Sequence, residues 1–145
     1  MSQQRKVRPI LLVEDNPMDV DLTVRAFARR HLLNPVDVAR DGEEALARFA
    51  QWEQGAPWPI VILLDLKLPR VDGLEVLRQL KAHARFRTIP VVVLSTSAED
   101  RDIRGAYDLG VNSYIVKPAS FDRFLEAAEK IEQYWCVLNT PLEQP

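Results

Sequence analysis

The stretch IVILLDLKLPRVDG, residues 60–73, decides which class of fold the chain can adopt. Its first five residues are all Ile, Val or Leu, so apolar side chains point to both sides of the segment. A strand of that kind is typical of a parallel sheet that is covered by helices on both faces. The run ends at Asp65, and a turn leads from there to Gly73. The stretch therefore predicts a central buried strand that delivers a carboxylate to the carboxyl end of a parallel sheet.

The same alternation of strand and helix extends in both directions from this segment. ILLV at residues 10–13 and VVVL at residues 91–94 are further apolar runs, and shorter strands are predicted at residues 36–39 and 114–116. A segment with helical spacing of apolar residues follows each strand. Five such units predict an α/β fold, a doubly wound parallel sheet of five strands with five helices.

Capping residues predict where several helices begin. Asn16 is a good N-cap and Pro17 suits a first helical position, so the first helix is expected to run from there to about Leu32. Ser97 and Asp100 have the spacing of a capping pair and predict the start of the fourth helix.

The chain has the size of a single domain. Its 145 residues are 47% hydrophobic and 28% charged, which fits one compact globular unit. We expect the core to span about residues 8–138, with a short flexible N-terminus and a C-terminal tail that frays. Residues 51–59 contain two tryptophans among Gly and Pro, and they predict an irregular, partly apolar loop.

Charge and cysteine content exclude several classes of function. The net charge is -2 and the pI about 5.7, so no broad cationic field is present that would bind nucleic acid or an anionic membrane. No apolar run approaches the ~20 residues that span a bilayer. Cys136 is the single cysteine, and the first residues lack the apolar region of a signal peptide. These features predict a cytoplasmic protein.

Reactive side chains gather at the predicted carboxyl ends of the strands. In chain order they are Glu14, Asp15, Asp65, Ser95 and Lys117. Each taken singly has an ordinary explanation as a helix cap, a turn residue or a surface lysine. In an open parallel sheet, however, these ends share one edge, where ligands bind. Carboxylates brought together there need a counter-charge, and hard oxygen ligands suit Mg²⁺. The combination therefore predicts a divalent-cation site.

Four segments identify a family that the chain resembles. LLVEDN, LLDLKLPRVDG, IPVVVLSTS and NSYIVKP are similar to the signature segments of response regulator receiver domains of two-component signalling, and the resemblance covers nearly the whole chain. It implies a flavodoxin-like sheet with strand order 2-1-3-4-5. It also implies that Asp65 is the phosphoacceptor, and that Glu14, Asp15 and the backbone carbonyl of Lys67 join it in binding Mg²⁺, for which Mn²⁺ can substitute.

The chemistry of phosphoryl transfer agrees with these roles. Such a reaction needs an in-line nucleophile and neutralised oxygens more than covalent help from the protein. Asp65 would attack, and Lys117 would take the phosphoryl oxygen away from the metal. Ser95 would donate a hydrogen bond to the acyl phosphate, and Tyr114 would follow it as a switch residue. A half-buried strand aromatic is an equally good interpretation of Tyr114 on sequence alone.

A finer resemblance concerns the signalling partner. LSTSAEDRDI, NSYIVKP and YWCVLN look like segments of the small single-domain regulators associated with bacterial and cyanobacterial phytochromes. The resemblance implies that the partner is a histidine kinase of phytochrome type. It also implies a cis peptide bond between Lys117 and Pro118, which an X-Pro bond makes accessible at ~0.5 to 1 kcal/mol.

Three other functions are compatible with parts of the pattern. A phosphatase of the haloacid dehalogenase class also uses a strand-end Asp nucleophile, but its usual acid two residues later is replaced by Lys67. A flavin or nucleotide module would need glycines after the first strand, where this chain is acidic and carries a proline. A phosphorylation-independent scaffold would not need the set Asp15, Asp65, Ser95 and Lys117.

The fifth helix has more apolar surface than one sheet face requires. We predict a homodimer through the face formed by the fourth helix, the fifth strand and the fifth helix. Tyr134 and Trp135 point about 100° apart on a helix, so one of them should face outward. The alternative is a monomer on which Trp135 folds back as a lid. The predicted interface residues are Ile131, Tyr134, Trp135 and Leu138.

Overall fold

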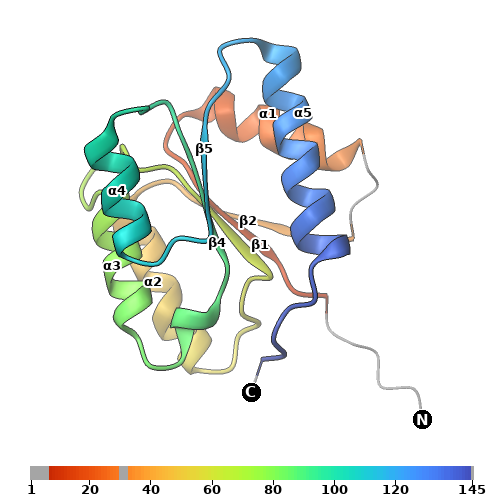
Figure 1. The fold of residues 1–145 in the computed structure, drawn as a ribbon. Helices are drawn as coiled ribbons and strands as arrows, with labels where there is room; N and C mark the ends of the chain where they lie inside the picture. The colour runs from red at the N-terminus through yellow and green to blue at the C-terminus, as the bar shows by residue number, and fades with distance from the viewer. Residues whose placement is uncertain (1–6, 30–32, 145) are drawn as a thin grey trace.

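Five parallel strands form one sheet in the computed structural model, which describes residues 7–29 and 33–144 (Figure 1). The strand order is β2-β1-β3-β4-β5, which confirms the predicted flavodoxin-like topology. Every pair of neighbouring strands is parallel. The strands are β1 (Ile10–Val13), β2 (Val36–Ala39), β3 (Val61–Leu64), β4 (Val91–Ser95) and β5 (Ser113–Val116).

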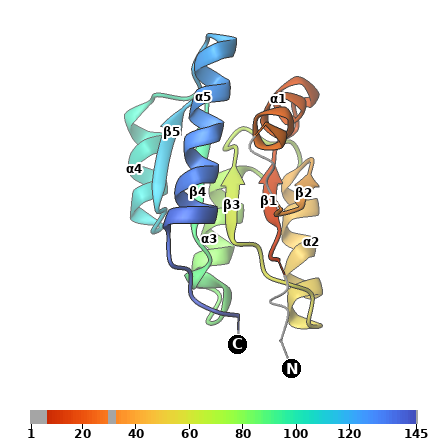
Figure 2. The ribbon, with the colours of Figure 1, turned by 90° about the vertical axis from the view of Figure 1, so that its right-hand side faces the viewer.

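Helices cover both faces of the sheet, as the doubly apolar strands predict. α1 and α5 lie side by side on one face, and α2, α3 and α4 lie on the other (Figure 2). Among the helices of the described residues, none combines the length and apolar character that a bilayer crossing requires. The helices are α1 (Pro17–Ala28), α2 (Gly42–Glu53), α3 (Gly73–Ala82), α4 (Asp100–Asp108) and α5 (Phe121–Glu132), with the 3-10 turn η1 (Phe86–Thr88) and the π-helix η2 (Gln133–Leu138).

The register of the strands brings their carboxyl ends together at one edge. Val13 of β1 is the partner of Leu64 of β3, and the N–H of Asp65 donates to the carbonyl of Val13 at 3.0 Å. At the end of β4, the carbonyl of Ser95 accepts a hydrogen bond from the N–H of Lys117 at 2.7 Å. The side chains that follow these strands therefore meet across the edge of the sheet.

The first helix begins where its capping residues predict. The side chain of Asn16 accepts hydrogen bonds from the N–H groups of Met18 and Asp19, and Pro17 is the first helical residue. α1 ends at Ala28, and the predicted extension to about Leu32 falls on residues 30–32, which lie outside the described part of the chain.

The predicted cap of α4 is wrong. The N-cap residue is Glu99, which makes no capping bond with its side chain, and α4 begins at Asp100. The Ser97 hydroxyl donates instead to the carboxylate of Asp102, inside the first turn of the helix. Ser97 thus belongs to the loop before the helix.

Residues 51–59 are more ordered than the sequence predicts. α2 continues to Glu53, so that only the second half of this segment is irregular. Trp52 and Trp58 are both buried, and their rings meet the ring of Phe86 edge-on, at centroid distances of 5.2 and 5.3 Å. The core therefore receives one aromatic side chain from the end of α2, Trp52, and one from the loop that follows, Trp58.

The C-terminal tail, for which the sequence predicts fraying, makes several hydrogen bonds to the rest of the chain. The guanidinium of Arg8 donates to the carbonyl of Leu142 at 2.8 Å. The side chain of Gln144 accepts from the N–H of Trp58 at 2.6 Å and donates to the carbonyl of Ala56 at 3.2 Å. These bonds hold the tail against the loop between α2 and β3. The predicted flexible N-terminus falls largely on residues 1–6, which lie outside the described residues.

Candidate functional site

Three carboxylates converge where β1 and β3 end. Glu14 and Asp15 follow β1, Asp65 follows β3, and each offers an oxygen atom that lies within 4.8 Å of the other two. Glu14 and Asp65 are buried, whereas Asp15 is exposed. Two of the three carboxylates are thus shielded from solvent, and the third is open to it.

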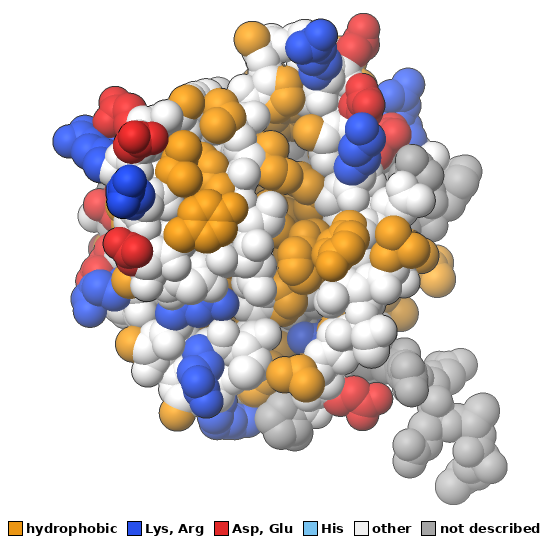
Figure 3. All heavy atoms as spheres, in the orientation of Figure 1, with side chains coloured by type: hydrophobic (Ala, Val, Ile, Leu, Met, Phe, Trp, Pro, Cys, Tyr) orange, Lys and Arg blue, Asp and Glu red, His pale blue; other side chains and the backbone are white. Residues whose placement is uncertain are grey.

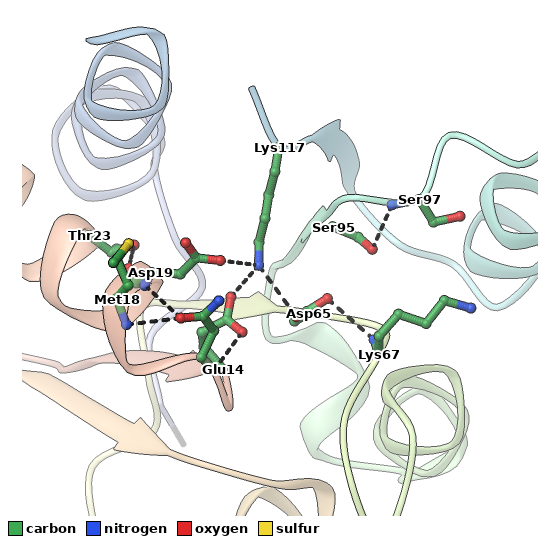
Figure 4. Close-up of polar contacts among 10 residues, drawn as sticks. Glu14, Met18, Asp19, Thr23, Asp65, Lys67, Ser95, Ser97 and Lys117 are labelled. Atoms are coloured by element: carbon green, nitrogen blue, oxygen red, sulfur yellow. Dashed lines mark hydrogen bonds and ion pairs between the residues drawn. The ribbon is translucent and has the colours of Figure 1, made fainter. Parts of the chain in front are cut away.

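The ammonium group of Lys117, which follows β5, reaches into this site. The Nζ atom of Lys117 lies 2.5 Å from an oxygen of Glu14, 2.8 Å from one of Asp19 and 3.4 Å from Oδ2 of Asp65 (Figure 4). Its side chain is only 6% exposed. Burial alone would lower the pKa of Lys117, but the bonds to Asp19 and Glu14 outweigh it and raise that pKa. Lys117 is therefore a fixed positive charge.

Glu14 is the carboxyl of this site whose pKa is raised above its ordinary value. Burial raises the pKa of its carboxyl to about 7, and the charge of Asp65 adds to the increase, while the hydrogen bond from Lys117 opposes it. One lysine thus does not fully offset the cost of burying this carboxylate beside Asp65.

The donor set fits a small divalent cation. Carboxylate oxygens are the ligands that Mg²⁺ prefers, and Asp15 opens the site to solvent, which leaves room for the waters that this ion retains. A cation would also add positive charge beside Glu14, and this charge would favour the ionised carboxylate against the effect of burial. Glu14, Asp15 and Asp65 are the residues that would hold it. The Lys67 carbonyl remains a predicted ligand.

Close packing of backbone fixes the loop that carries Asp65. A side chain on Gly73 would place its Cβ 2.3 Å from the carbonyl oxygen of Asp65 and 2.6 Å from the Cα of Leu66, so only glycine fits. The N–H of Gly73 donates to the carbonyl of Leu66 at 2.9 Å. The N–H of Lys67 donates to Oδ1 of Asp65 at 3.3 Å. The carboxylate is therefore held from its own loop on one side and by Lys117 on the other.

The two predicted switch residues, Ser95 and Tyr114, both form hydrogen bonds with Ser97 in the loop after β4. Ser95 is fully buried, and its hydroxyl accepts a hydrogen bond from the N–H of Ser97 at 3.2 Å. The hydroxyl of Tyr114 donates to the carbonyl of Ser97 at 2.8 Å. Burial raises the pKa of Tyr114. Both side chains are thus bonded to the same short segment.

Two acidic residues of the site escape prediction from the sequence. Asp19 lies in the first turn of α1, and its carboxylate accepts a hydrogen bond from the Lys117 ammonium at 2.8 Å. The spacing of Asp15 and Asp19, one helical turn apart, was the available signal. Asp102 bonds to Ser97 and pairs with the Lys67 ammonium at 3.4 Å. No pattern in the sequence connects Asp102 to Lys67.

The predicted cis bond after Lys117 is wrong. Residues 7–29 and 33–144 contain no cis peptide bond, so Lys117–Pro118 is trans. Lys117 nevertheless reaches the carboxylates, because β5 ends beside β4 and the long side chain spans the remaining distance.

Comparison with known proteins agrees with this geometry. The family model described as response regulator receiver domain matches residues 10–129. The chain is 48% identical over 131 residues to "Probable methanogenesis regulatory protein FilR2" of Methanothrix harundinacea (strain 6Ac), covering 90% of this chain and 84% of that protein. It is 37% identical over 128 residues to "Response regulator Rcp1" of Synechocystis sp. (strain ATCC 27184 / PCC 6803 / Kazusa), covering 87% of each.

Solved structures show the same fold. The phosphorylated cyanobacterial phytochrome response regulator RcpA has a TM-score of 0.89 and 41% identity, with 95% of this chain and 100% of that chain covered. The Mn²⁺-bound form of response regulator Rcp1 has a TM-score of 0.88 and 35% identity, with 94% and 99% covered.

Proposed function

Since this chain belongs to the response regulator receiver domain family, we propose that it accepts a phosphoryl group on Asp65 from a histidine kinase. A receiver of this kind is a signalling phosphoacceptor rather than an enzyme. One observation carries the choice of Asp65. It is a buried carboxylate of the acidic group that directly follows the central strand β3, and it is hydrogen-bonded by the Lys67 N–H and the Lys117 ammonium.

The side chains have distinct tasks in the proposed transfer. The carboxylate of Asp65 attacks phosphorus in line with the phosphorus–nitrogen bond of a phosphohistidine, which breaks as the acyl phosphate forms. Lys117 neutralises a phosphoryl oxygen, which requires it to loosen one of its present bonds. Ser95 turns its hydroxyl from Ser97 toward the phosphoryl group and donates to it. Tyr114 moves together with the loop after β4, to which its hydroxyl is bonded.

The metal for this transfer is proposed to be Mg²⁺, with Mn²⁺ as a substitute. Glu14, Asp15, Asp65 and the Lys67 carbonyl would hold it, and it would neutralise charge on the transferring group. The similar protein Rcp1 has a Mn²⁺-bound form, which supports this choice.

We further propose that the kinase is of phytochrome type. RcpA is described as a cyanobacterial phytochrome response regulator, and 46% of the aligned residues are identical to those of the bacteriophytochrome response regulator AtBRR. FilR2, in contrast, is named as a regulator of methanogenesis at 48% identity. We expect a purified phytochrome kinase to transfer its phosphoryl group to this chain at least as fast as an unrelated histidine kinase does.

Phosphate incorporation is expected to require the metal. With acetyl phosphate or a phosphorylated kinase as donor, intact mass spectrometry should detect one added phosphoryl group in Mg²⁺ or Mn²⁺ and almost none in EDTA. The reason is that the acidic group repels an incoming phosphate until a cation neutralises it. Equal incorporation in EDTA would contradict the metal requirement.

The proposed output is a contact between copies of the chain. Hydrophobic side chains lie exposed over α4 and in the region between α4 and α5 (Figure 3). Tyr134 is 50% exposed and Leu138 is 66% exposed, so both are available to a partner. Trp135 is partly buried against the core between α1 and α5, which agrees with one member of the pair facing outward. Ile131 is buried, so it supports this face from beneath.

Truncation of the exposed aromatic should weaken the proposed dimer. Tyr134→Ala removes an anchor whose loss costs ~2 kcal/mol, or more than tenfold in the dimer constant. Sedimentation of wild type and variant, each with and without beryllofluoride, measures this. Leu33→Ala, at a position 82% exposed in the loop before β2, is the matched control and should change nothing. A wild type that stays monomeric at high micromolar concentration in both states would eliminate the dimer.

A further inference from the structure

A second polar cluster lies beside the acidic site, between the loop after Asp65 and the loop after β4. Its centre is Asp102, in the first turn of α4, which is 6% exposed although it is charged. Oδ2 of Asp102 accepts from the Ser97 hydroxyl at 2.5 Å and lies 3.4 Å from the Lys67 ammonium. One carboxylate oxygen thus joins α4 to both loops.

Ser97 in turn fixes the hydroxyl that phosphoryl binding needs. Its N–H donates to Oγ of Ser95, and its carbonyl accepts from the Tyr114 hydroxyl. Its own Oγ also accepts from the N–H of Glu99 at 3.3 Å. In Figure 4 the Ser95 hydroxyl faces Ser97, and the Lys67 ammonium points away from Asp65. The cluster therefore holds the Lys67 ammonium away from the phosphoacceptor and ties the Ser95 hydroxyl to the same loop.

We propose that Asp102 is a positioning residue, which holds the segment 95–97 in a resting arrangement and competes with a phosphoryl group on Asp65 for the Lys67 ammonium. The inference rests on the proposed function, because it needs phosphate at Asp65. It adds a residue of α4 to the groups that control how readily Asp65 is phosphorylated.

The competition follows from charge. A phosphoryl group carries a charge of about −1.5 to −2, whereas Asp102 carries a single negative charge. The Lys67 side chain is 60% exposed and lies two residues after Asp65, so it is free to turn toward the larger charge. When Lys67 leaves, Asp102 loses its cation, the loop that carries Ser97 loosens, and the Ser95 hydroxyl turns to donate its proton to the phosphoryl oxygen. Removal of the Asp102 charge should therefore release Lys67 and loosen the segment 95–97 in part, before phosphorylation occurs.

Asp102→Asn is expected to speed phosphorylation by acetyl phosphate about fivefold, which corresponds to about 1 kcal/mol at 1.36 kcal/mol per tenfold. The substitution keeps the shape of the side chain and removes its charge. Ser97→Ala, which breaks the same joint from the loop side, should have a similar effect. Ser97→Thr keeps the hydroxyl and should restore the wild-type rate. Asp108→Asn makes the same charge change at an exposed position of α4 and is the matched control.

A spectroscopic measurement separates positioning from a loss of stability. Amide NMR signals of Ser95, Ser97 and Tyr114 are recorded in wild type, free and with Mg²⁺ and beryllofluoride. In unphosphorylated Asp102→Asn these signals should move along the line that joins the two wild-type positions, and in Ser97→Ala the signals of Ser95 and Tyr114 should do the same. Signals that stay at the free wild-type positions, or leave that line, would overturn the role of Asp102.

The outcomes also separate this inference from the proposed function. If wild type takes no phosphate in Mg²⁺, the assignment of Asp65 fails. If wild type is phosphorylated while Asp102→Asn and Ser97→Ala keep its rate, only the role of Asp102 fails.

Discussion

Asp65→Asn is expected to reduce phosphate incorporation to below about 1% of the wild-type rate, because an amide oxygen is not a competent nucleophile. The substitution keeps the planar shape of the side chain, and its oxygen can still accept from the N–H of Lys67. The fold should persist, since Asp65 makes the longest of the three contacts to Lys117. The loss would therefore be one of chemistry and not of structure.

The measurement combines intact mass after incubation with acetyl phosphate and Mg²⁺ with thermal unfolding of the same samples. Asp108→Asn, an exposed acid of α4, is the control and should incorporate phosphate as wild type does. Removing one of three clustered carboxylates relieves repulsion, so the unfolding temperature of Asp65→Asn in EDTA should not fall. Wild-type incorporation by the variant would show that another residue accepts the phosphate.

The fold and the composition of the acidic group were predictable because local signals agree with the topology. β3 and β4 are apolar on both faces, and both are central strands. Parallel strands place their carboxyl ends on one edge, so Glu14, Asp15 and Asp65 had to meet once the strand order was known. The Asn16 cap was predictable for a similar reason, since it depends only on residues within one turn.

The contacts that escaped prediction join residues far apart in the chain through single side chains. Gln144 bonds to the backbone of Trp58, a separation of 86 residues, so no local pattern in the sequence indicates that the tail contacts this loop. Asp102 meets Lys67 only because α4 packs beside the loop after β3. The trans Lys117–Pro118 bond differs from what family resemblance implied, because tertiary context selects the isomer.

Lys117→Met should cause the largest loss of stability among single changes at the site. Its ammonium is buried among Glu14, Asp19 and Asp65, and removing one partner of a buried ionic group costs about 3 kcal/mol. The hydrogen bond from Lys117 now lowers the pKa of Glu14, against the effect of burial. Without that bond, the pKa of Glu14 in the folded state should rise further above about 7.

The resulting pH dependence has a definite sign. A carboxyl whose folded-state pKa is raised binds its proton more tightly in the folded state than in the unfolded state. Stability is then greatest below the unfolded pKa of Glu14 and is lost as pH rises through the folded pKa. Urea unfolding in EDTA should therefore show a free energy of unfolding for Lys117→Met that falls more steeply than that of wild type between about pH 5 and pH 8.

Mg²⁺ should recover part of the stability that Lys117→Met loses, because a cation bound by Glu14, Asp15 and Asp65 replaces the missing positive charge. The recovery, measured as the change in the free energy of unfolding between EDTA and millimolar Mg²⁺, should exceed that of wild type. Lys130→Met is the matched control, since Lys130 is 71% exposed in its pair with Glu126 and should cost less than about 1 kcal/mol. Equal losses at the two lysines would mean that Lys117 is not the counter-charge of the acidic group. A larger loss at Lys117 that Mg²⁺ leaves unchanged would mean that the carboxylates do not bind the ion.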